Sequence, residues 1–440
     1  MAIKVCKFGG TSMADGNIIK AVKQIILSDP ERRYVVVSAP GKRYSGDNKV
    51  TDLLYACHAA LIEEGTCKNG FAPVRARINS IVKELNIDFE VSSLLDETER
   101  QIDEERSEDF TVSRGEYLCA RIVAEVLGAR FIDAASVIFF DKDGIFDGDR
   151  SYKAISAVCA NCNLAVIPGF YGQGADGKVK TFSRGGSDIT GAIVARAVQA
   201  TSYENWTDVS GFLACDPKIV DSPKLIKKIS YKELRELSYM GASVVHGDSI
   251  FPVRQANIPI HIKNTFRPQD DGTTILPGSR YMPDSNPVIG IAGKKNFTVI
   301  CVEKSLKDEE NWILADVLEV FARENVWVEH VPSSIDTLSV VIDCKQLGGD
   351  KLQRVVEGIK AKVAPDSINV TENVALISTV GLGMTSSIGT CARLFTAIAA
   401  ANINVKLISH CSSGINVIVG VNNEDYEKCI RTIYSEFFTN

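Results

Sequence analysis

The stretch KVCKFGGTSMAD, Lys4–Asp15, shows a short strand pattern that ends in a lysine, two glycines and two hydroxyl residues. Glycine weakens a strand, so a pair at its end indicates that another group approaches the backbone closely. A lysine beside bare backbone amides suits a phosphate group. The G-x-x-x-x-G-K-[ST] pattern of the common phosphate-binding loop is absent here, so the stretch predicts a phosphate site of another kind.

Strand and helix patterns alternate outward from this stretch, from residue 3 to about residue 280. Runs rich in β-branched residues, such as Tyr34–Ala39 and Pro259–Asn264, lie between amphipathic segments such as Gly115–Gly128. This alternation predicts an α/β fold, a sandwich of three layers around a mostly parallel central sheet. Ligands of such sheets bind at the carboxyl ends of the strands, which is where Gly9 and Gly10 fall.

Composition excludes several classes of protein. The chain has 440 residues, enough for two or three domains, and a formal net charge of -6. Nucleic acids and anionic membranes require a concentrated basic face, so neither is expected as a partner. No apolar run reaches the roughly 18 residues of a transmembrane helix. The twelve cysteines are scattered, which indicates reduced thiols and a cytoplasmic protein.

The C-terminal part of the sequence contains an internal repeat. After a segment at residues 281–293 that we interpret as a linker, residues 315–334 align with residues 392–411. Asn325 falls on Asn402, which gives an offset of 402 − 325 = 77 residues. Each copy has the pattern helix, turn, strand, loop, strand, which predicts two similar α+β domains. The alternative is a duplicated packing module that binds no ligand.

Several other motifs admit a purely structural reading. In TFSRGGSDITGAIVARA, Thr181–Ala197, the arginine and glycines suit an anion, but Ser187 or Asp188 would also serve as a helix N-cap. SRGE, Ser113–Glu116, fits a capping box, and Thr51 fits an ordinary N-cap.

Two motifs are better explained by structure than by chemistry. GQGADG, Gly172–Gly177, fits a dinucleotide-binding pattern, but an extended pattern follows it, so we interpret it as a turn. Cys159 and Cys162 form a C-x-x-C pair with no second pair nearby, which favours a helix face over a metal or redox site. No metal ligands are predicted.

Taken together, these stretches resemble the aspartate kinases of the amino-acid kinase superfamily. The motifs follow the family's order across nearly the whole chain: KFGGTS, SRGE, SRGGSD, WTDVSG and MGASVVH. The C-terminal repeat is similar to that family's tandem ACT domains, which have a ferredoxin-like α+β fold. The resemblance implies a kinase domain at residues 1–283 and ACT regions at residues 294–370 and 371–440, with strands that may be exchanged between them.

The implied reaction transfers the γ-phosphoryl group of MgATP to the side-chain carboxylate of L-aspartate, giving 4-phospho-L-aspartate. This is the first step of lysine, threonine and methionine biosynthesis. A carboxylate is already a nucleophile, so positioning and charge stabilisation suffice. Mg²⁺ is expected to be held by phosphates and water. The alternatives are a kinase for a related acidic amino acid and a degenerate kinase that acts only as an amino-acid sensor.

The resemblance also assigns roles to residues. Lys7 is expected to neutralise the phosphoryl group, and Asp188 to organise that lysine. Glu116 would pair with the substrate ammonium group, and Arg184 would bind a substrate carboxylate. The other expected aspartate contacts are Ser38, Thr51 and Ser187. The expected nucleotide contacts are Lys7, Gly9, Gly10, Thr207, Asp208, Leu213 and Lys218.

Three residues depart from the family pattern on the nucleotide side. Leu213 replaces a tyrosine, Lys218 an arginine and Ser243 a lysine, so we expect activity with an altered ATP affinity.

The ACT repeat implies feedback inhibition by an end-product amino acid, with lysine favoured and threonine the other candidate. The implied effector pocket comprises Glu310, Ile313, Leu314, Glu329, Ser333 and Ser334. Glu329 would pair with an ammonium group, or else would simply face solvent. Trp312 stands where relatives commonly have glycine. ACT domains pair through exposed strand edges, so a homodimer or a dimer of dimers is expected.

Overall fold

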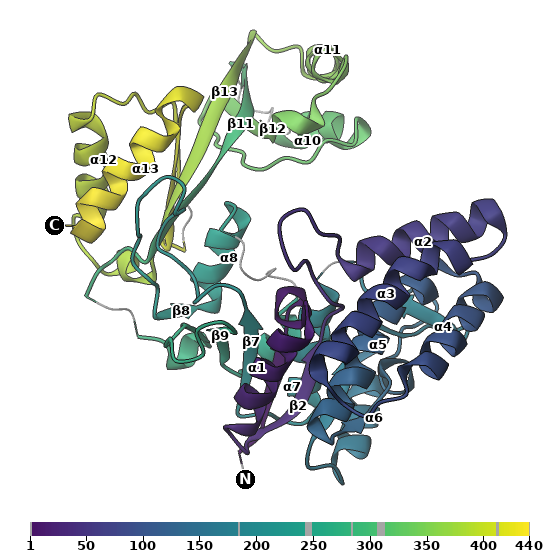
Figure 1. Ribbon diagram of the computed structural model, residues 1–440. Helices are drawn as coiled ribbons and strands as arrows, with labels where there is room; N and C mark the ends of the chain where they lie inside the picture. The colour runs from purple at the N-terminus through teal and green to yellow at the C-terminus, as the bar shows by residue number, and fades with distance from the viewer. Residues whose placement is uncertain are drawn as a thin grey trace. The chain divides into compact units, whose positions relative to one another are not determined.

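The computed structural model describes residues 2–183, 185–242, 249–282, 285–305, 313–410 and 413–439. The chain divides into two compact units (Figure 1). The first unit comprises Met1–Phe212, Leu225–Leu234 and Val244–Tyr281. The second unit comprises Leu213–Lys224, Arg235–Ser243 and Met282–Asn440. The domain boundaries given above stay a prediction.

The first unit is built on an eight-stranded sheet with the order β3-β4-β2-β1-β7-β9-β10-β8. All neighbouring strands are parallel except β9 and β10, so the predicted mostly parallel sheet is confirmed. The strands are β1 (Lys4–Phe8), β2 (Arg32–Val37), β3 (Arg130–Phe131), β4 (Ala165–Pro168), β7 (Ser202–Thr207), β8 (Lys228–Ser230), β9 (Ile260–Asn264) and β10 (Thr273–Leu276).

The helices with residues in this unit are α1 (Gly16–Leu27), α2 (Val50–Glu64), α3 (Lys68–Leu85), α4 (Val91–Glu105), α5 (Glu108–Leu127), α6 (Gly148–Cys159), α7 (Gly186–Ala197), α8 (Tyr231–Tyr239) and α9 (Phe251–Gln255). Of α8, residues 231–234 belong to this unit and the rest to the second. Helix α5 contacts β2, β3 and β4, and α7 contacts β1, β2 and β7. Cys6 and Phe8 pack into a core that contains residues of α1, α3 and α5. Because side chains alternate along a strand, Lys7 points to the opposite face, where it contacts α7.

The structure corrects the N-cap predictions. Helix α7 begins after Gly185, whose positive φ of 59° suits glycine, so neither Ser187 nor Asp188 is the cap. Helix α5 begins after Ser107, so Ser113–Glu116 lies inside the helix and forms no capping box. Helix α2 begins at Val50 after Lys49, so Thr51 is not a cap either. The residues SRGE, SRGGSD and Thr51 therefore need another explanation.

Two smaller predictions have different outcomes. The glycine-rich stretch GQGADG is a turn, as predicted, because it lies in the hairpin of β5 (Tyr171–Gln173) and β6 (Val179–Thr181). Cys159 is the last residue of α6, and Cys162 lies beyond the helix. The prediction that the two cysteines share a helix face is therefore wrong. Both are buried free thiols, like most cysteines of the described residues.

The second unit contains a five-stranded antiparallel sheet with the order β12-β11-β13-β15-β14. Its elements are β11 (Gly290–Glu303), α10 (Ile313–Arg323), β12 (Thr337–Asp343), α11 (Lys351–Val363), β13 (Ser367–Val380), α12 (Thr390–Ala400), β14 (Leu407–Ser409), β15 (Asn416–Asn422) and α13 (Tyr426–Tyr434). Strand β11 includes residues 290–293, so the interpretation of 281–293 as a linker was wrong at its end.

The repeat recurs in the structure with the predicted offset. Adding 77 to the bounds of α10 gives those of α12, and adding 77 to the bounds of β11 gives those of β13. Asn325 and Asn402 lie two residues beyond the ends of the equivalent helices, with φ values of 52° and 54°. Asparagine tolerates this left-handed conformation better than most residues, which explains its presence in both copies.

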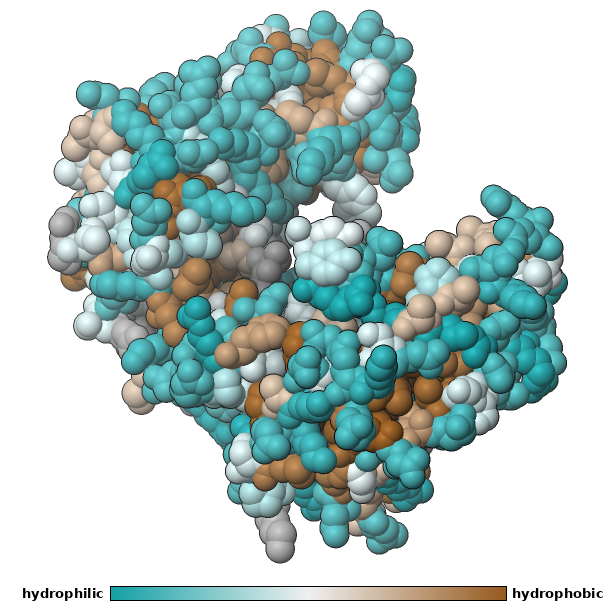
Figure 2. All heavy atoms as spheres, in the orientation of Figure 1, coloured by the Kyte–Doolittle hydropathy of each residue, from teal (hydrophilic) through white to brown (hydrophobic). Residues whose placement is uncertain are grey.

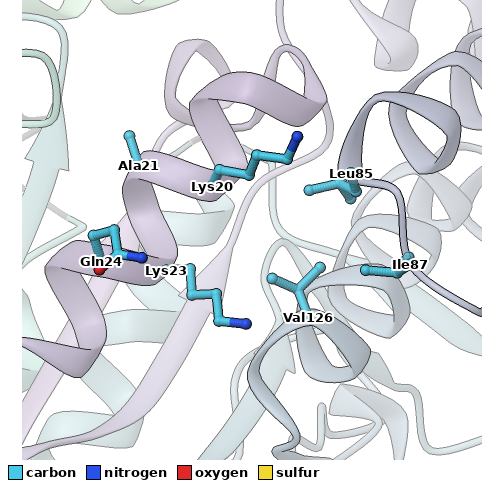
Figure 3. Close-up of a pocket in the computed structure, with 7 residues that line it drawn as sticks. All are labelled: Lys20, Ala21, Lys23, Gln24, Leu85, Ile87 and Val126. Carbon is cyan, nitrogen blue, oxygen red and sulfur yellow. The ribbon is translucent and has the colours of Figure 1, made fainter.

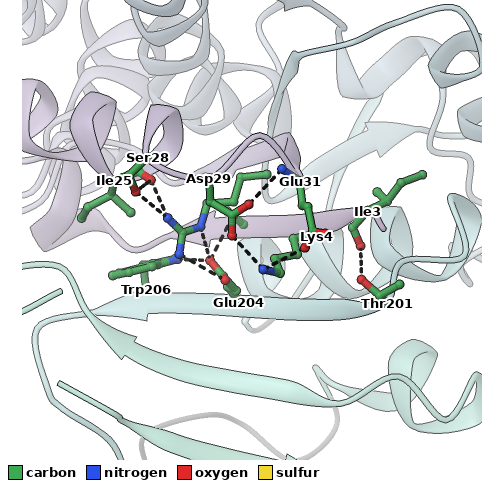
Figure 4. A network of polar contacts seen from close by, with 11 residues as sticks. Ile3, Lys4, Ile25, Ser28, Asp29, Glu31, Thr201, Glu204 and Trp206 are labelled. Carbon is green, nitrogen blue, oxygen red and sulfur yellow. Dashed lines mark hydrogen bonds and ion pairs between the residues drawn. The ribbon is translucent and has the colours of Figure 1, made fainter. Parts of the chain in front are cut away.

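A buried polar network joins the three central strands of the first unit (Figure 4). Glu204 on β7 accepts hydrogen bonds from Arg32 Nε at 2.8 Å and from Trp206 Nε1 at 2.9 Å. The Cys6 thiol on β1 donates to the same carboxylate at 3.3 Å. A carboxylate with this many donors is compensated, so the network fixes the side-by-side position of β1, β2 and β7.

Most side chains on the face shown in Figure 2 are hydrophilic, with apolar residues between them. A surface cavity of about 440 Å³ lies between α1 and the ends of α3 and α5 (Figure 3). Its walls are Lys20, Ala21, Lys23, Gln24, Leu85, Ile87 and Val126, none of which is a predicted site residue. Among the described residues, no helix is long and apolar enough to span a bilayer.

Candidate active site

The site centres on Lys7, near the carboxyl end of the middle strand β1. The side chain is buried, and its Nζ lies 2.6 Å from Oδ1 of Asp188 in the first turn of α7. The ammonium group also lies 3.6 Å from the point where a Cβ on Gly9 would stand. A side chain at Gly9 would therefore stand in van der Waals contact with the Lys7 ammonium group.

Backbone packs on backbone at the end of β1, as the glycine pair indicated. The approaching group is the loop after β2: Gly41 N donates to the Gly10 carbonyl oxygen at 2.8 Å. A Cβ on Gly41 would lie 2.6 Å from the Gly10 carbonyl carbon, and a Cβ on Gly10 would lie 3.1 Å from the Ala39 carbonyl oxygen. Gly41 thus requires glycine, whereas a side chain at Gly10 would need the Ala39 backbone to shift by a few tenths of an ångström. Gly41 is a site residue that sequence reasoning missed, although its place after a strand was a usable signal.

Glu116 is a buried carboxyl group in the middle of α5. Its Oε2 atom has no hydrogen-bond partner among the described residues. Burial raises the pKa of Glu116 from 4.5 to about 8. A buried carboxyl oxygen without a donor is unfavourable unless a ligand supplies the donor. A ligand ammonium group would do so.

The other predicted aspartate contacts lie on neighbouring segments. Ser38 follows β2, and its N–H donates to the Phe8 carbonyl oxygen at 3.1 Å. Ser187 lies against the end of β4, where a Cβ on Gly169 would be 2.6 Å from Ser187 Oγ. Thr51 is the second residue of α2 and is half-buried. Arg184 lies outside the described residues.

On the nucleotide side, Thr207 ends β7, and its hydroxyl donates to Asp208 Oδ1 at 3.2 Å. The Thr207 carbonyl oxygen accepts from Thr265 N at 2.9 Å, which anchors this strand end. Leu213 and Lys218 belong to the second compact unit. Ser243 lies outside the described residues.

The predicted effector residues lie in the second unit. Leu314 in α10 is exposed, Ile313 begins that helix, and Ser333 and Ser334 lie in the turn before β12. Ser334 N donates to the Thr337 carbonyl oxygen at 2.8 Å. Glu310 and Trp312 lie outside the described residues.

Glu329 does not simply face solvent. The hydroxyl group of Tyr239 donates a hydrogen bond to its carboxylate, and both residues belong to the second unit. The ring of Tyr239 also packs edge-on against His330, and the Lys294 ammonium lies 5.4 Å from its centroid. Sequence reasoning missed Tyr239, because 90 residues separate it from Glu329.

Comparison with known proteins agrees with this geometry. The model of the amino acid kinase family matches residues 2–264, and a model of the ACT domain matches residues 377–437. The chain thus has the fold of an amino acid kinase with an ACT region.

Individual relatives narrow the class. Aspartokinase 3 of Bacillus subtilis is 34% identical over 451 residues, covering 99% of each chain. The crystal structure of Clostridium acetobutylicum aspartate kinase is 48% identical, with a TM-score of 0.93 and complete coverage of both chains. Escherichia coli aspartokinase III, crystallised with aspartate and ADP, is 25% identical, with a TM-score of 0.76 and coverage of 99% of this chain and 100% of that one. The chain therefore belongs to the aspartokinases of the amino acid kinase family, and the resemblance is confirmed.

Proposed function

We propose that this chain binds L-aspartate and MgATP and transfers the γ-phosphoryl group to the aspartate side-chain carboxylate. The product is 4-phospho-L-aspartate, which opens the route to lysine, threonine and methionine. The observation that carries this proposal is the ion pair of buried Lys7 with half-buried Asp188, beside Gly9 at the end of the central strand, in a chain of the aspartokinase family. Escherichia coli aspartokinase III in complex with aspartate and ADP supports both substrates.

Lys7 supplies the positive charge for the transferring group. The Nζ atom has three N–H donors, and Asp188 Oδ1 at 2.6 Å accepts one of them. The phosphoryl oxygens would accept another, in a buried environment where the interaction is strong. Gly9 and Gly10 allow the phosphates to approach the backbone.

The aspartate substrate would present opposite charges to Glu116 and Arg184. Glu116 Oε2 receives an N–H of the substrate ammonium group, and the guanidinium of Arg184 binds a carboxylate. Ser38, Thr51 and Ser187 complete the contacts. No general base is assigned, because the acceptor carboxylate is ionised at neutral pH.

The nucleotide would lie against Thr207 and Asp208, with Leu213 and Lys218 as further contacts. Mg²⁺ bound with ATP would neutralise phosphate charge during transfer. The described residues contain no group of three or more His, Cys, Asp or Glu side chains that could hold a metal. This donor set fits an ion held mainly by phosphate oxygens and water.

The test is aspartate-dependent ADP release with MgATP, compared with L-glutamate and N-acetyl-L-glutamate. We expect turnover with L-aspartate alone, and its loss in Lys7→Met. The control is Lys153→Met, an exposed lysine on α6. Preference for glutamate would favour the related acid kinase. If the folded protein shows no turnover with any acceptor but is stabilised by lysine, the sensor alternative holds instead.

We also propose that lysine inhibits the enzyme by binding near Glu329, Ser333 and Ser334. The crystal structure of Escherichia coli aspartokinase III with lysine and aspartate in the T-state, which is 25% identical to this chain with a TM-score of 0.77 and coverage of 99% of each, supports this effector over threonine. We expect lysine, and not threonine, to inhibit aspartate-dependent ADP release. Inhibition by threonine alone would overturn the assignment.

Finally, we propose a homodimer or a dimer of dimers through the second unit. Trp327 and Ile335 are 77% and 83% exposed there, which is unusual for large apolar residues. Light scattering of the full-length protein should give two or four chains, and a monomer would contradict the proposal.

A further inference from the structure

A buried asparagine contacts both members of the central ion pair. Asn205 lies in the middle of β7, where its side chain is 3% exposed. Its Nδ2 donates to Asp188 Oδ1 at 2.9 Å, and its Oδ1 lies 3.5 Å from Lys7 Nζ. Asn205 thus contacts the same carboxylate oxygen that Lys7 contacts.

Because Asn205 lies in a central strand of the sheet, its side-chain amide must find hydrogen-bond partners inside the protein. Lys7 is its register partner on β1, and the buried Ile262 is its partner on β9. Central strands of parallel sheets are normally apolar on both faces, and asparagine is disfavoured in strands. A buried amide also costs stability unless it is hydrogen-bonded. Among the described residues, the hydrogen bonds that its side chain makes are those to Lys7 and Asp188.

The Asn205 amide weakens the competition between Asp188 and a phosphoryl group for the Lys7 ammonium group. In a close lysine–carboxylate pair, the carboxylate competes with the phosphoryl oxygens for the ammonium group. The Asn205 amide donates to the same Oδ1 atom, so it takes part of the accepting capacity that would otherwise hold Lys7. It also fixes the side-chain rotamer of Asp188.

We propose that Asn205 is a positioning residue for phosphoryl transfer: it holds the Asp188 carboxylate and accepts one N–H of Lys7, so that the remaining N–H of the ammonium group is left for the transferring group. This inference rests on the proposed function. Turnover by the wild-type enzyme in the same assay tests the proposed function, whereas the comparison of Asn205 variants with the wild type tests this inference.

Two substitutions separate positioning from packing. Asn205→Leu keeps a similar size and removes both hydrogen bonds. Asn205→Asp places a second carboxyl group beside Asp188, and two carboxylates this close raise one of the two pKa values, so the pair holds a shared proton at low pH and loses it as the pH rises. When the pair shares a proton, the new acid donates to Asp188 as the amide did. The charged groups that face this position are Lys7 on β1 and Asp188 on α7, and the Tyr203 hydroxyl donates to the Asp188 backbone carbonyl at 3.2 Å.

The measurement is kcat and the KM for aspartate between pH 6 and pH 8.5. At pH 8.5 we expect kcat to fall about tenfold or more in both variants, as loss of a charge-assisted hydrogen bond implies. The KM for aspartate should change less than about twofold, because Glu116 is untouched. As the pH falls, the ratio of N205D to wild-type kcat should rise, while the ratio for N205L should stay flat.

The control is Ser202→Ala on the same strand, which removes a buried hydroxyl that has no hydrogen-bond partner among the described residues. Its kcat should match the wild type. Wild-type kcat in N205L, or a pH-independent N205D ratio, would overturn the proposal. If N205L does not fold, the pH dependence of N205D, measured with its melting temperature at each pH, decides the question.

Discussion

Glu116 offers a direct measurement of how the empty site is prepared for aspartate. Burial raises its pKa to about 8, and an ammonium group beside Oε2 would lower that pKa again, because opposite charges favour the ionised form. With a pKa near 8, about nine-tenths of these groups are protonated at pH 7 and about one-tenth at pH 9. Aspartate binding should therefore release about 0.9 proton at pH 7 and about 0.1 at pH 9.

Isothermal titration calorimetry in two buffers of different ionisation enthalpy measures this number directly. The aspartate affinity should also rise by nearly tenfold per pH unit between pH 6 and pH 7. Glu116→Gln provides the control, because glutamine cannot release the proton. Tight binding at pH 7 without proton release would refute either the raised pKa or the contact with the ammonium group.

The same pKa shift predicts how the empty protein responds to pH. An unfolded glutamate titrates near 4.5 and the folded one near 8, so between these values the folded state holds more protons. Stability therefore falls as pH rises through this window, by at most about 5 kcal/mol for the difference 8 − 4.5 = 3.5. Glu116→Gln should melt at a higher temperature than the wild type at pH 8.5 and converge with it towards pH 5. Equal melting temperatures at both pH values would contradict the shift.

Three further predictions follow from contacts in the two units. Gly41→Ala should abolish most ADP release, because its Cβ would stand 2.6 Å from the Gly10 carbonyl carbon. An active variant would show that the loop after β2 can shift without loss of function. Tyr239→Phe should tighten lysine inhibition about twofold to tenfold, because it removes a hydrogen bond to Glu329 that lysine must replace; an unchanged inhibition constant contradicts this. Arg77→Met should lower the free energy of unfolding by about 3–5 kcal/mol, because it leaves the buried Asp47 without its 2.6 Å partner, and a smaller loss in denaturant titration would show that Arg43 compensates.

Local patterns predicted the elements of the fold well. The alternation of strands and helices is a property of neighbouring residues, and it gave the parallel sheet. The repeat was equally visible, because Asn325 and Asn402 follow equivalent helices in the same left-handed conformation. In both cases the decisive interactions lie within a few residues along the chain.

Helix boundaries and polar contacts were harder to predict for a physical reason. SRGE fits a capping box by its spacing, but Ser107 caps the helix and Glu116 falls in its buried middle. A four-residue pattern cannot distinguish these positions, because burial depends on segments far away in the sequence. Asn205 illustrates the same limit, since its partners Lys7 and Asp188 lie 198 and 17 residues away.

The described residues of the candidate site keep their charges compensated in two different ways. Lys7 is neutralised by Asp188, whereas burial of Glu116 favours its neutral form. In the proposed function, the ammonium group of aspartate would displace a proton from Glu116, and the phosphoryl group of ATP would compete with Asp188 for Lys7. Because only the first event releases a proton, the pH dependence of aspartate binding and that of phosphoryl transfer should be separable. Glu116→Gln should remove the former and leave the latter, whereas Asn205→Asp should alter the latter alone.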